Sequence, residues 1–303
     1  MESDAELLTP TYAGFRTMFR LPAVVDPAGW ADADIAVVGI PFDVATTNRP
    51  GARFGPAAVR EMSLMVAQGE HYPTGVWLDA LSAVDTGDVI LDLHNPLTVR
   101  DAITAHLRRI VEAGCRPLTL GGDHYVTYPV LRAIAEKHGP VALVHFDAHT
   151  DTWEPTDEHD LNHGSMFVHA LREGLIDRDR SIQVGIRTFN PDTRGVRILD
   201  APWVRANGTA ATIAAVRTHV GSGPAYLTFD IDALDPSSAP GTGTPVAGGL
   251  GTGEAIDIVG ALDGIDWVGA DVVEVAPVYD SAGVTALAAA QIAAEWMVVA
   301  TRS

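Results

Sequence analysis

Six short runs of this sequence are apolar almost without interruption, and they limit the possible folds more than any other feature. Two of them are "IAVVGIP" (35–41) and "VALVHFD" (141–147), and the other four cover 116–122, 181–187, 225–232 and 266–275. Strands with one solvent-exposed face alternate apolar and polar residues, whereas strands covered on both faces do not. The runs therefore predict a mostly parallel β-sheet with both faces covered.

Helix-type patterns separate these runs, at 55–68, 97–113, 124–137, 210–220, 252–263 and 284–300. Strands that alternate with helices in this way are typical of an α/β fold with a layer of helices on each face of the sheet. No repeat, low-complexity tract or linker interrupts the 303 residues. We therefore predict a single domain over 1–303, with 1–30 as an N-terminal extension.

The charge balance narrows the possible partners. The chain has 20 Lys and Arg against 39 Asp and Glu, a formal net charge of −19. Such a surface repels nucleic acid and anionic membranes and attracts cations such as metal ions, amines and guanidinium compounds. The acidic residues could equally serve solubility alone. We expect neither a nucleic acid nor a membrane as partner.

Cysteine usage and the N-terminal stretch indicate the compartment. Cys115 is the single cysteine, which rules out an intrachain disulfide and favours a reducing environment. The stretch "MESDAELLTPTY" is acidic and polar, unlike a signal or transit peptide. No apolar run approaches the roughly 18 residues that span a membrane. These features predict a cytoplasmic protein.

Acids and histidines gather where several predicted strands end. Three long polar loops, 42–55, 148–165 and 231–250, also follow strands, and ligands bind at this carboxyl edge in open parallel sheets. One His or Asp at a strand end more often caps a loop, but six on three strand ends favour a metal site, since burying unpaired carboxylates is costly. The six are His124, Asp147, His149, Asp151, Asp230 and Asp232.

This inventory could hold two divalent ions that share bridging carboxylates. Its many oxygen ligands suit Mn²⁺ better than Zn²⁺. Two such ions lower the pKa of a shared water and so supply hydroxide at neutral pH. His145 has the same alternate spacing in "HFDAHTDT" but lies one step back inside the strand. We interpret it as a residue that supports or packs beneath the site.

Five long motifs resemble the signature blocks of the ureohydrolases, the arginase and agmatinase family. They are "GGDHYVTYP" (121–129), "HFDAHTDT" (145–152), "NHGSMF" (162–167), "TFDIDALDPSSAPGTGTP" (228–245) and "DVVEVAPVYD" (271–280). The segment "GIPFDVATTNRPGARFGPAAVRE" (39–61) resembles the agmatinase branch. The likeness extends from about residue 35 to 300. It implies a three-layer α/β/α arginase-type fold with a central, mostly parallel sheet of about eight strands, two Mn²⁺ per subunit, and a homo-oligomer, a trimer or hexamer.

The resemblance also implies a role for each site residue. One ion would be held by His124, Asp147, Asp151 and Asp230. The other would be held by Asp147, His149, Asp230 and Asp232, so that Asp147 and Asp230 bridge. His163 matches a mobile proton-transfer histidine, and Glu274 matches the acid that pairs with a substrate guanidinium. With Asp151, His163 would relay a proton to the leaving amine after hydroxide attacks the guanidinium carbon.

The expected reaction is hydrolysis of a small cationic guanidino substrate to urea and an amine, with agmatine giving putrescine. The loop 153–164 contains Glu154, Asp157, Glu158 and Asp160 and no Lys or Arg, which favours a substrate with an ammonium tail. Arg49 and Arg53 are the counter-argument, because either could meet a carboxylate tail.

Three alternatives remain open. One is another guanidino substrate, such as 4-guanidinobutyrate, 3-guanidinopropionate, a proclavaminate-type compound or guanidine. A second is a single-zinc polyamine or lysine deacetylase that uses Asp147, His149 and Asp230. The third is a metal-retaining protein without catalytic activity.

Overall fold

The computed structural model describes residues 10–67, 70–72 and 74–302. Residues 1–9, where no targeting signal is expected, lie outside the described residues. Within this part of the chain one sheet has eight strands in the order β4-β1-β5-β10-β9-β6-β7-β8, and all of its neighbouring pairs are parallel. The strands are β1 (Ile35–Ile40), β4 (Ala83–Asp88), β5 (Arg116–Gly121), β6 (Ala142–Phe146), β7 (Ile182–Val184), β8 (Arg197–Leu199), β9 (Pro224–Asp230) and β10 (Asp266–Val273).

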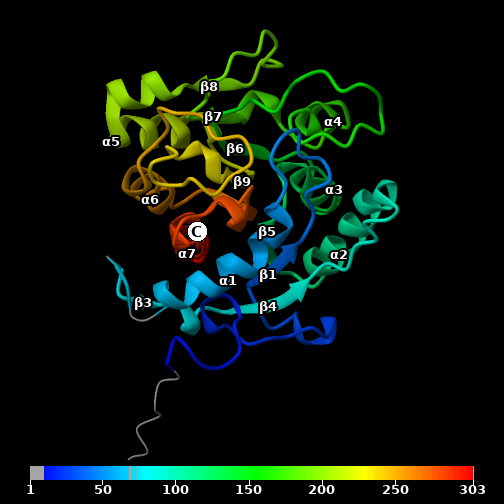
Figure 1. Cartoon of the computed structure of the whole chain (residues 1–303), viewed down its shortest axis with the longest axis vertical. Helices are drawn as coiled ribbons and strands as arrows, with labels where there is room; N and C mark the ends of the chain where they lie inside the picture. Colours follow the sequence, from blue (N-terminus) through cyan, green and yellow to red (C-terminus); the bar gives the residue numbers. More distant parts are fainter. Residues whose placement is uncertain (1–9, 68–69, 73, 303) are drawn as a thin grey trace, which may run out of the picture.

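Helices cover both faces of this sheet (Figure 1). One layer contains α1 (Gly55–Val66), α5 (Ala201–Val220), α6 (Thr252–Gly260) and α7 (Val284–Ala300). The other contains α2 (Val99–Glu112), α3 (Thr127–His138) and α4 (Met166–Arg172). The predicted fold class, a three-layer α/β/α arrangement around a parallel sheet of about eight strands, is confirmed.

The packing of β1 explains why its sequence is continuously apolar. Ile35 and Val37 belong to the core under α1 and α7, whereas Ala36 and Val38 belong to the core under α2 and α3. Side chains on a strand alternate between its faces, so a strand with a core on each side has no polar positions. The same rule identified the six interior strands from sequence.

Two strands of the sheet, β4 and β8, are absent from the sequence-based prediction. Both lie at the edges. In β4, "AVDTGD", Asp85 and Asp88 bind the Arg60 guanidinium of α1, at 2.8 and 2.6 Å, instead of contributing apolar surface. β8 has only three residues and begins with exposed Arg197. Edge strands are short and carry charges, so the apolar pattern does not reveal them.

Smaller elements also differ from the prediction. α4 was not predicted, and α5 begins at Ala201 rather than at 210, with Asp200 accepting from the backbone N–H of Trp203 at 2.7 Å. Gly208 interrupts α5 with φ 79° and ψ 174°. A two-stranded antiparallel sheet, β2 (Glu70–His71) and β3 (Val76–Trp77), lies outside the main sheet. The single-domain prediction stays a prediction.

Strand order determines where the site forms. The four adjacent strands β5, β10, β9 and β6 end next to one another, and their carboxyl ends lead into His124, Glu274, Asp230 and Asp147. The loops after β1 and β5 meet closely here, since a Cβ on Gly122 would lie 2.1 Å from the carbonyl oxygen of Phe42. Only glycine fits there.

Candidate metal centre

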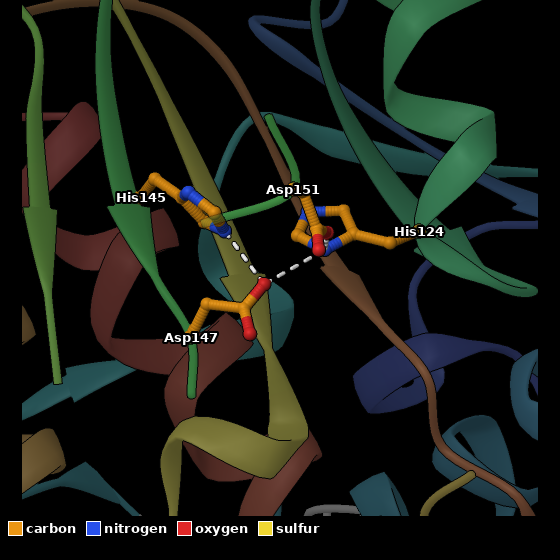
Figure 2. Close-up of side chains that lie close together, drawn as sticks. All are labelled: His124, His145, Asp147 and Asp151. Atoms are coloured by element: carbon orange, nitrogen blue, oxygen red, sulfur yellow. Dashed lines mark hydrogen bonds and ion pairs between the residues drawn. The ribbon is translucent and has the colours of Figure 1, made fainter. Parts of the chain in front are cut away.

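A first cluster forms around the imidazole of His124. Its Nδ1 lies 3.2 Å from Asp147 Oδ2, 3.0 Å from Asp151 Oδ2 and 3.2 Å from Asp230 Oδ2. Figure 2 shows His124 from one segment of the chain close to Asp147 and Asp151 from another. Nδ1 is buried and makes no hydrogen bond within the described residues, although three oxygens surround it. Neighbouring ligand atoms around a small divalent ion are roughly 3 Å apart, so this geometry fits an ion between them.

The opposite side of the His124 ring is held by a chain of hydroxyl groups. His124 Nε2 lies 2.8 Å from Thr228 Oγ1, and that hydroxyl donates to Asp271 Oδ1 at 2.6 Å. Asp271 Oδ2 accepts from the hydroxyls of Thr127 and Tyr226, both at 2.8 Å. Because Thr228 uses its hydrogen on Asp271, its oxygen accepts from Nε2–H, which leaves the lone pair of the imidazole on Nδ1.

A second cluster lies on the other side of Asp147. His149 Nδ1 is 3.3 Å from Asp147 Oδ1 and 3.1 Å from Asp232 Oδ2. Asp147 thus faces His124 with one oxygen and His149 with the other, as a bridging carboxylate would. The structure brings together all six residues predicted as metal ligands. Five of them belong to groups that could hold metal ions, and the sixth, Asp230, lies 3.2 Å from His124 Nδ1. Their individual assignments stay predictions.

The electrostatics of these clusters favour bound cations. Burial raises the pKa of Asp230 well above its ordinary value, and the charges of Asp232 and Asp147 raise it further. Burial and the charge of Asp147 raise the pKa of Asp232 to about 6. Burial lowers the pKa of His149, but Asp147 and Asp232 raise it, and the result is about 12. Buried acids that repel one another are stabilised by divalent ions among them.

His145 supports the clusters from inside β6. Gln183 Nε2 donates to His145 Nδ1 at 3.0 Å and to Thr150 O at 2.8 Å. The other ring nitrogen, Nε2, must then carry the hydrogen, and it donates to Asp147 Oδ2 at 2.7 Å (Figure 2). Although His145 lies close enough to share an ion, its available nitrogen is protonated. This agrees with its interpretation as a supporting residue.

Glu274 and His163 form a pair beside the first cluster. Glu274 is fully buried, and its Oε1 accepts from His124 N and from His163 Nδ1, both at 2.8 Å. Its other oxygen, Oε2, is buried without a hydrogen-bond partner among the described residues. A buried carboxylate oxygen with no partner is costly, so this oxygen is suited to a cationic ligand.

The Thr47 amide N–H points at His163 Nε2 from 3.2 Å, and Thr47 Oγ1 lies 2.9 Å from the same atom. This favours the neutral ring with its hydrogen on Nδ1. Burial also favours the neutral form, but the charge of Glu274 raises the pKa of His163 to about 9. The His163 ring therefore lies between Glu274, whose charge favours a second proton, and the Thr47 amide N–H, which opposes a proton on Nε2.

Asp151 and Glu274 both have a left-handed backbone, with φ of 50° and 65°. This conformation costs a residue other than glycine of order 1–3 kcal/mol and persists only where its surroundings impose it. Two of the three residues predicted to be catalytic therefore carry backbone strain. Strain of this kind is frequent at functional sites, but no sequence pattern reveals it.

A cavity of about 400 Å³ opens over the clusters. The three long loops predicted at the carboxyl edge provide most of its wall, and His149, Asp151, Asp230 and His163 are exposed to it. The complete lining is Thr47, His149, Asp151, Trp153, Asn162, His163, Gly164, Asp230 and Thr244. Larger hollows of about 590 and 480 Å³ lie elsewhere, and neither is lined by cluster residues.

The charged residues weighed for the substrate tail do not line this cavity. Arg49 donates to the carbonyls of Thr242 and Gly243 and lies 4.3 Å from the ring centre of Tyr279. Arg53 is paired with Asp43. Both arginines thus have structural partners, which removes the counter-argument based on them.

The acids of the loop 153–164 are also engaged elsewhere. Glu154 pairs with Arg172 and Arg194, and Asp160 accepts from Thr156 N and Ser165 Oγ. None of the four acids lines the cavity. The argument that these acids attract an ammonium tail directly therefore lacks structural support.

Comparison with known proteins assigns the chain to a family. A sequence model of the Arginase family matches residues 33–299. The chain belongs to the Arginase family. The predicted membership of the ureohydrolases is thereby confirmed.

Individual relatives of this Arginase family chain carry more specific names. It is 52% identical to an agmatinase of Chromobacterium violaceum over 95% of this chain and 89% of that protein. It is 45% identical to an agmatinase of Proteus mirabilis over 98% of this chain and 95% of that protein. A crystal structure of a hypothetical agmatinase from Burkholderia thailandensis superposes with a TM-score of 0.93 at 50% identity. The match covers 96% of this chain and 92% of that one. The proclavaminate amidino hydrolase of Streptomyces clavuligerus superposes with a TM-score of 0.92 at 39% identity. The match covers 97% of this chain and 99% of that one.

Sequence reasoning missed several residues of this Arginase family site. Asp271 and Thr228 orient His124, Gln183 orients His145, and Thr47 holds His163. Asp271 and Gln183 had a detectable signal, since each is a polar residue inside an otherwise apolar strand. Thr47 had none, because 116 residues separate it from His163.

Proposed function

We propose that the protein is an agmatinase, which hydrolyses agmatine to putrescine and urea with two Mn²⁺ ions per subunit. The observation that carries the proposal is the buried Oε2 of Glu274, which has no hydrogen-bond partner in the described part of the chain and lies beside two clusters suited to metal ions. A reaction at a guanidinium carbon needs both an activated water and a carboxylate that holds the cation. The names of the relatives at 45–52% identity support the same activity.

In this proposal the ions are held as the family resemblance implies. The first would be bound by His124, Asp147, Asp151 and Asp230, and the second by Asp147, His149, Asp230 and Asp232. When bound, such a pair supplies Lewis acidity and a water that ionises near neutral pH. A single-zinc deacetylase would leave His124 and Asp232 without a role, whereas both lie within the clusters.

Glu274 would orient the substrate. Its Oε1 is fixed by His124 N and His163 Nδ1, so the carboxylate cannot rotate freely. Oε2 is then left to accept from a guanidinium N–H, and charge-assisted hydrogen bonds of this kind are strong and directional. Because Glu274 is fully buried behind His163, displacement of the His163 side chain would open the carboxylate to the cavity. Fixing the planar cation in this way lowers the entropic cost of reaction.

His163 and Asp151 would move the proton that the leaving amine needs. Both line the cavity. In the described tautomer His163 carries a proton on Nδ1, and the charge of Glu274 favours a second proton on Nε2. A histidine can hold one or two ring protons, which suits His163 to take up and release a proton.

The cavity wall favours a cationic tail. Among the described residues no Lys or Arg lines it, so a carboxylate tail would find no cationic side chain in the wall. Trp153 offers an indole face, on which an ammonium or a methylene chain can lie. These features support agmatine over 4-guanidinobutyrate and 3-guanidinopropionate.

A urea-release assay tests the proposal. With saturating Mn²⁺, we expect kcat/KM for agmatine to exceed the values for 4-guanidinobutyrate, 3-guanidinopropionate, arginine and guanidine by at least tenfold. A preference for 4-guanidinobutyrate would contradict the argument from the cavity wall. Two bound ions with no urea from any of these compounds would instead identify a non-catalytic relative.

We also propose that the protein works in the cytoplasm as a homo-oligomer, a trimer or hexamer, and binds neither nucleic acid nor membranes. The charge of −19 and the single buried cysteine support this setting. In residues 10–67, 70–72 and 74–302, no helix has both the length and the apolar composition to cross a membrane. Exposed Val278, Val284 and Leu287 near the start of α7 offer apolar surface for a subunit contact, and light scattering would measure the mass.

A further inference from the structure

Arg187, which follows β7, makes an unusual set of contacts. Its half-buried guanidinium makes six donor–acceptor contacts through its five N–H groups, so at least one N–H is shared, and every acceptor is a backbone carbonyl oxygen. It forms no ion pair with any described carboxylate, although the charges of Asp232 and Asp147 act on it. Burial lowers the pKa of Arg187, but it stays charged at any ordinary pH. The acceptors are Val246, Gly185, Ala233, Asp232 and Leu234.

Three of these carbonyls belong to the turn that carries Asp232. Arg187 Nη2 lies 2.6 Å from Asp232 O and 3.2 Å from Leu234 O, and Nη1 lies 3.3 Å from Ala233 O. Nη2 and Nε also bind Val246 O, at 2.8 and 3.1 Å, near the far end of the same loop. One side chain thus connects both ends of the loop 231–250.

The backbone of Arg187 reaches the loop that carries His149. The N–H groups of Arg187 and Thr188 both donate to Ala148 O, at 2.9 and 3.1 Å. Ala148 N in turn donates to Asp232 Oδ1 at 3.0 Å. Arg187 therefore holds, from two sides, the segments that place His149 and Asp232 opposite each other.

The first cluster is tied to Arg187 only indirectly, because Asp232 N donates to Asp230 Oδ1 at 2.8 Å and Asp147 belongs to both clusters. None of the six contacts reaches His124, Asp151 or Asp230. The His124 ring is held separately, by Thr228 and Asp271. A change at Arg187 should consequently affect the second cluster more strongly than the first.

We propose that Arg187 is a positioning residue for the second metal site, the one that Asp147, His149, Asp230 and Asp232 would form. The inference rests on the proposed dinuclear centre. A guanidinium has five N–H donors in a fixed plane, which suits several carbonyls that surround it. A lysine at this position would keep the charge but has only three donors on a flexible stem, and glutamine would lose the charge as well.

Two variants, Arg187→Lys and Arg187→Gln, test this role, with Arg205→Lys as the matched control. Arg205 is exposed on α5 and also donates to a carbonyl of the loop 231–250, that of Gly248. Protein freed of metal with a chelator would be titrated with Mn²⁺ by calorimetry. Electron paramagnetic resonance would then distinguish isolated from coupled Mn²⁺ ions.

We expect both Arg187 variants to retain the first site and to bind the second Mn²⁺ about 10–100-fold more weakly, as for other residues that orient metal ligands. In these variants the electron paramagnetic resonance spectrum of coupled Mn²⁺ ions should be absent at two equivalents of Mn²⁺ and should return at a higher Mn²⁺ concentration. The control should match the wild type.

Equal weakening of both sites, or wild-type affinity at the second, would overturn the role of Arg187. A variant without the folded circular dichroism spectrum would also overturn it, because Arg187 would then support the whole fold. If the wild type itself binds fewer than two ions, the proposed function fails instead, which separates the two conclusions.

Discussion

Glu274 uses one carboxylate oxygen within the protein and leaves the other free, and this asymmetry defines its role at the residue scale. Oε1 is held by His124 N and His163, whereas Oε2 has no partner among the described residues. Glu274 also keeps a left-handed backbone, with φ 65°. An acid in a strained, buried and half-satisfied position contributes little to stability, which supports the proposed role of Glu274 in binding a cation.

Glu274→Gln should therefore lower kcat/KM for agmatine at least 100-fold while both Mn²⁺ ions remain bound. The amide has nearly the same shape but cannot form a charge-assisted pair with a guanidinium. A 100-fold loss corresponds to about 2.7 kcal/mol of transition-state stabilisation. Steady-state kinetics and metal analysis provide the measurement. Glu154→Gln, an acid on the neighbouring loop outside the cavity, is the control, and activity of Glu274→Gln within threefold of wild type would disprove the assignment.

Sequence reasoning singled out the six residues that the structure brings together in the clusters, and His145 as their support, but it missed Arg187 and Asp271. His124, Asp147, His149, Asp151, Asp230 and Asp232 follow apolar strands at short spacing, so their convergence could be predicted. Arg187 and Asp271 act through hydrogen bonds to segments far away in the chain. Such partners depend on side-chain direction in the folded state, which spacing alone does not determine.

At the scale of elements, sequence patterns predicted the helix and the strands that are buried on nearly all sides and missed the strands at the edges of the sheet. α7 was predicted over its observed range because its sequence is apolar on nearly all sides. β4 and β8 were missed because edge strands bury less surface and carry charges. The first half of α5 was missed because Gly208 breaks the helical pattern.

Gly208→Ala should lower the free energy of unfolding by about 1–3 kcal/mol. Gly208 has φ 79° and ψ 174°, which only glycine adopts readily, and an added Cβ would touch nothing within 4 Å. The cost would thus come from the backbone alone. Gly253→Ala in α6 is the control, since its Cβ also meets nothing and its φ is not positive. That control should be neutral or stabilising by about 0.5–1 kcal/mol.

Urea denaturation curves of the two variants would measure this difference. If Gly208→Ala were as stable as wild type, α5 would have to continue through this position as a regular helix.

Four acids of the molecule, Asp147, Asp151, Asp230 and Asp232, are buried together in the two clusters. Removing Mn²⁺ with a chelator should lower Tm by several degrees, because an ion that binds only the folded state at 100 times its Kd stabilises it by about 2.7 kcal/mol. Thermal scans at increasing Mn²⁺ would measure the shift. Asp147→Asn, which alters both clusters, should abolish the Mn²⁺ dependence. A wild-type Tm that ignores Mn²⁺ would argue against the proposed centre.

The cavity and the clusters beneath it combine residues at strand ends with residues of connecting loops. Asp147 and Asp230 stand at strand ends, fixed by the sheet, whereas Thr47, Trp153 and Asn162 belong to connecting loops. Loops accept substitution and insertion at little expense to the core. Proteins with this architecture can therefore change their substrate through loop substitutions while the residues at the strand ends stay the same. Proteins named agmatinase, proclavaminate amidino hydrolase and formimidoylglutamase, all superposable on this chain, are what such a history would leave behind.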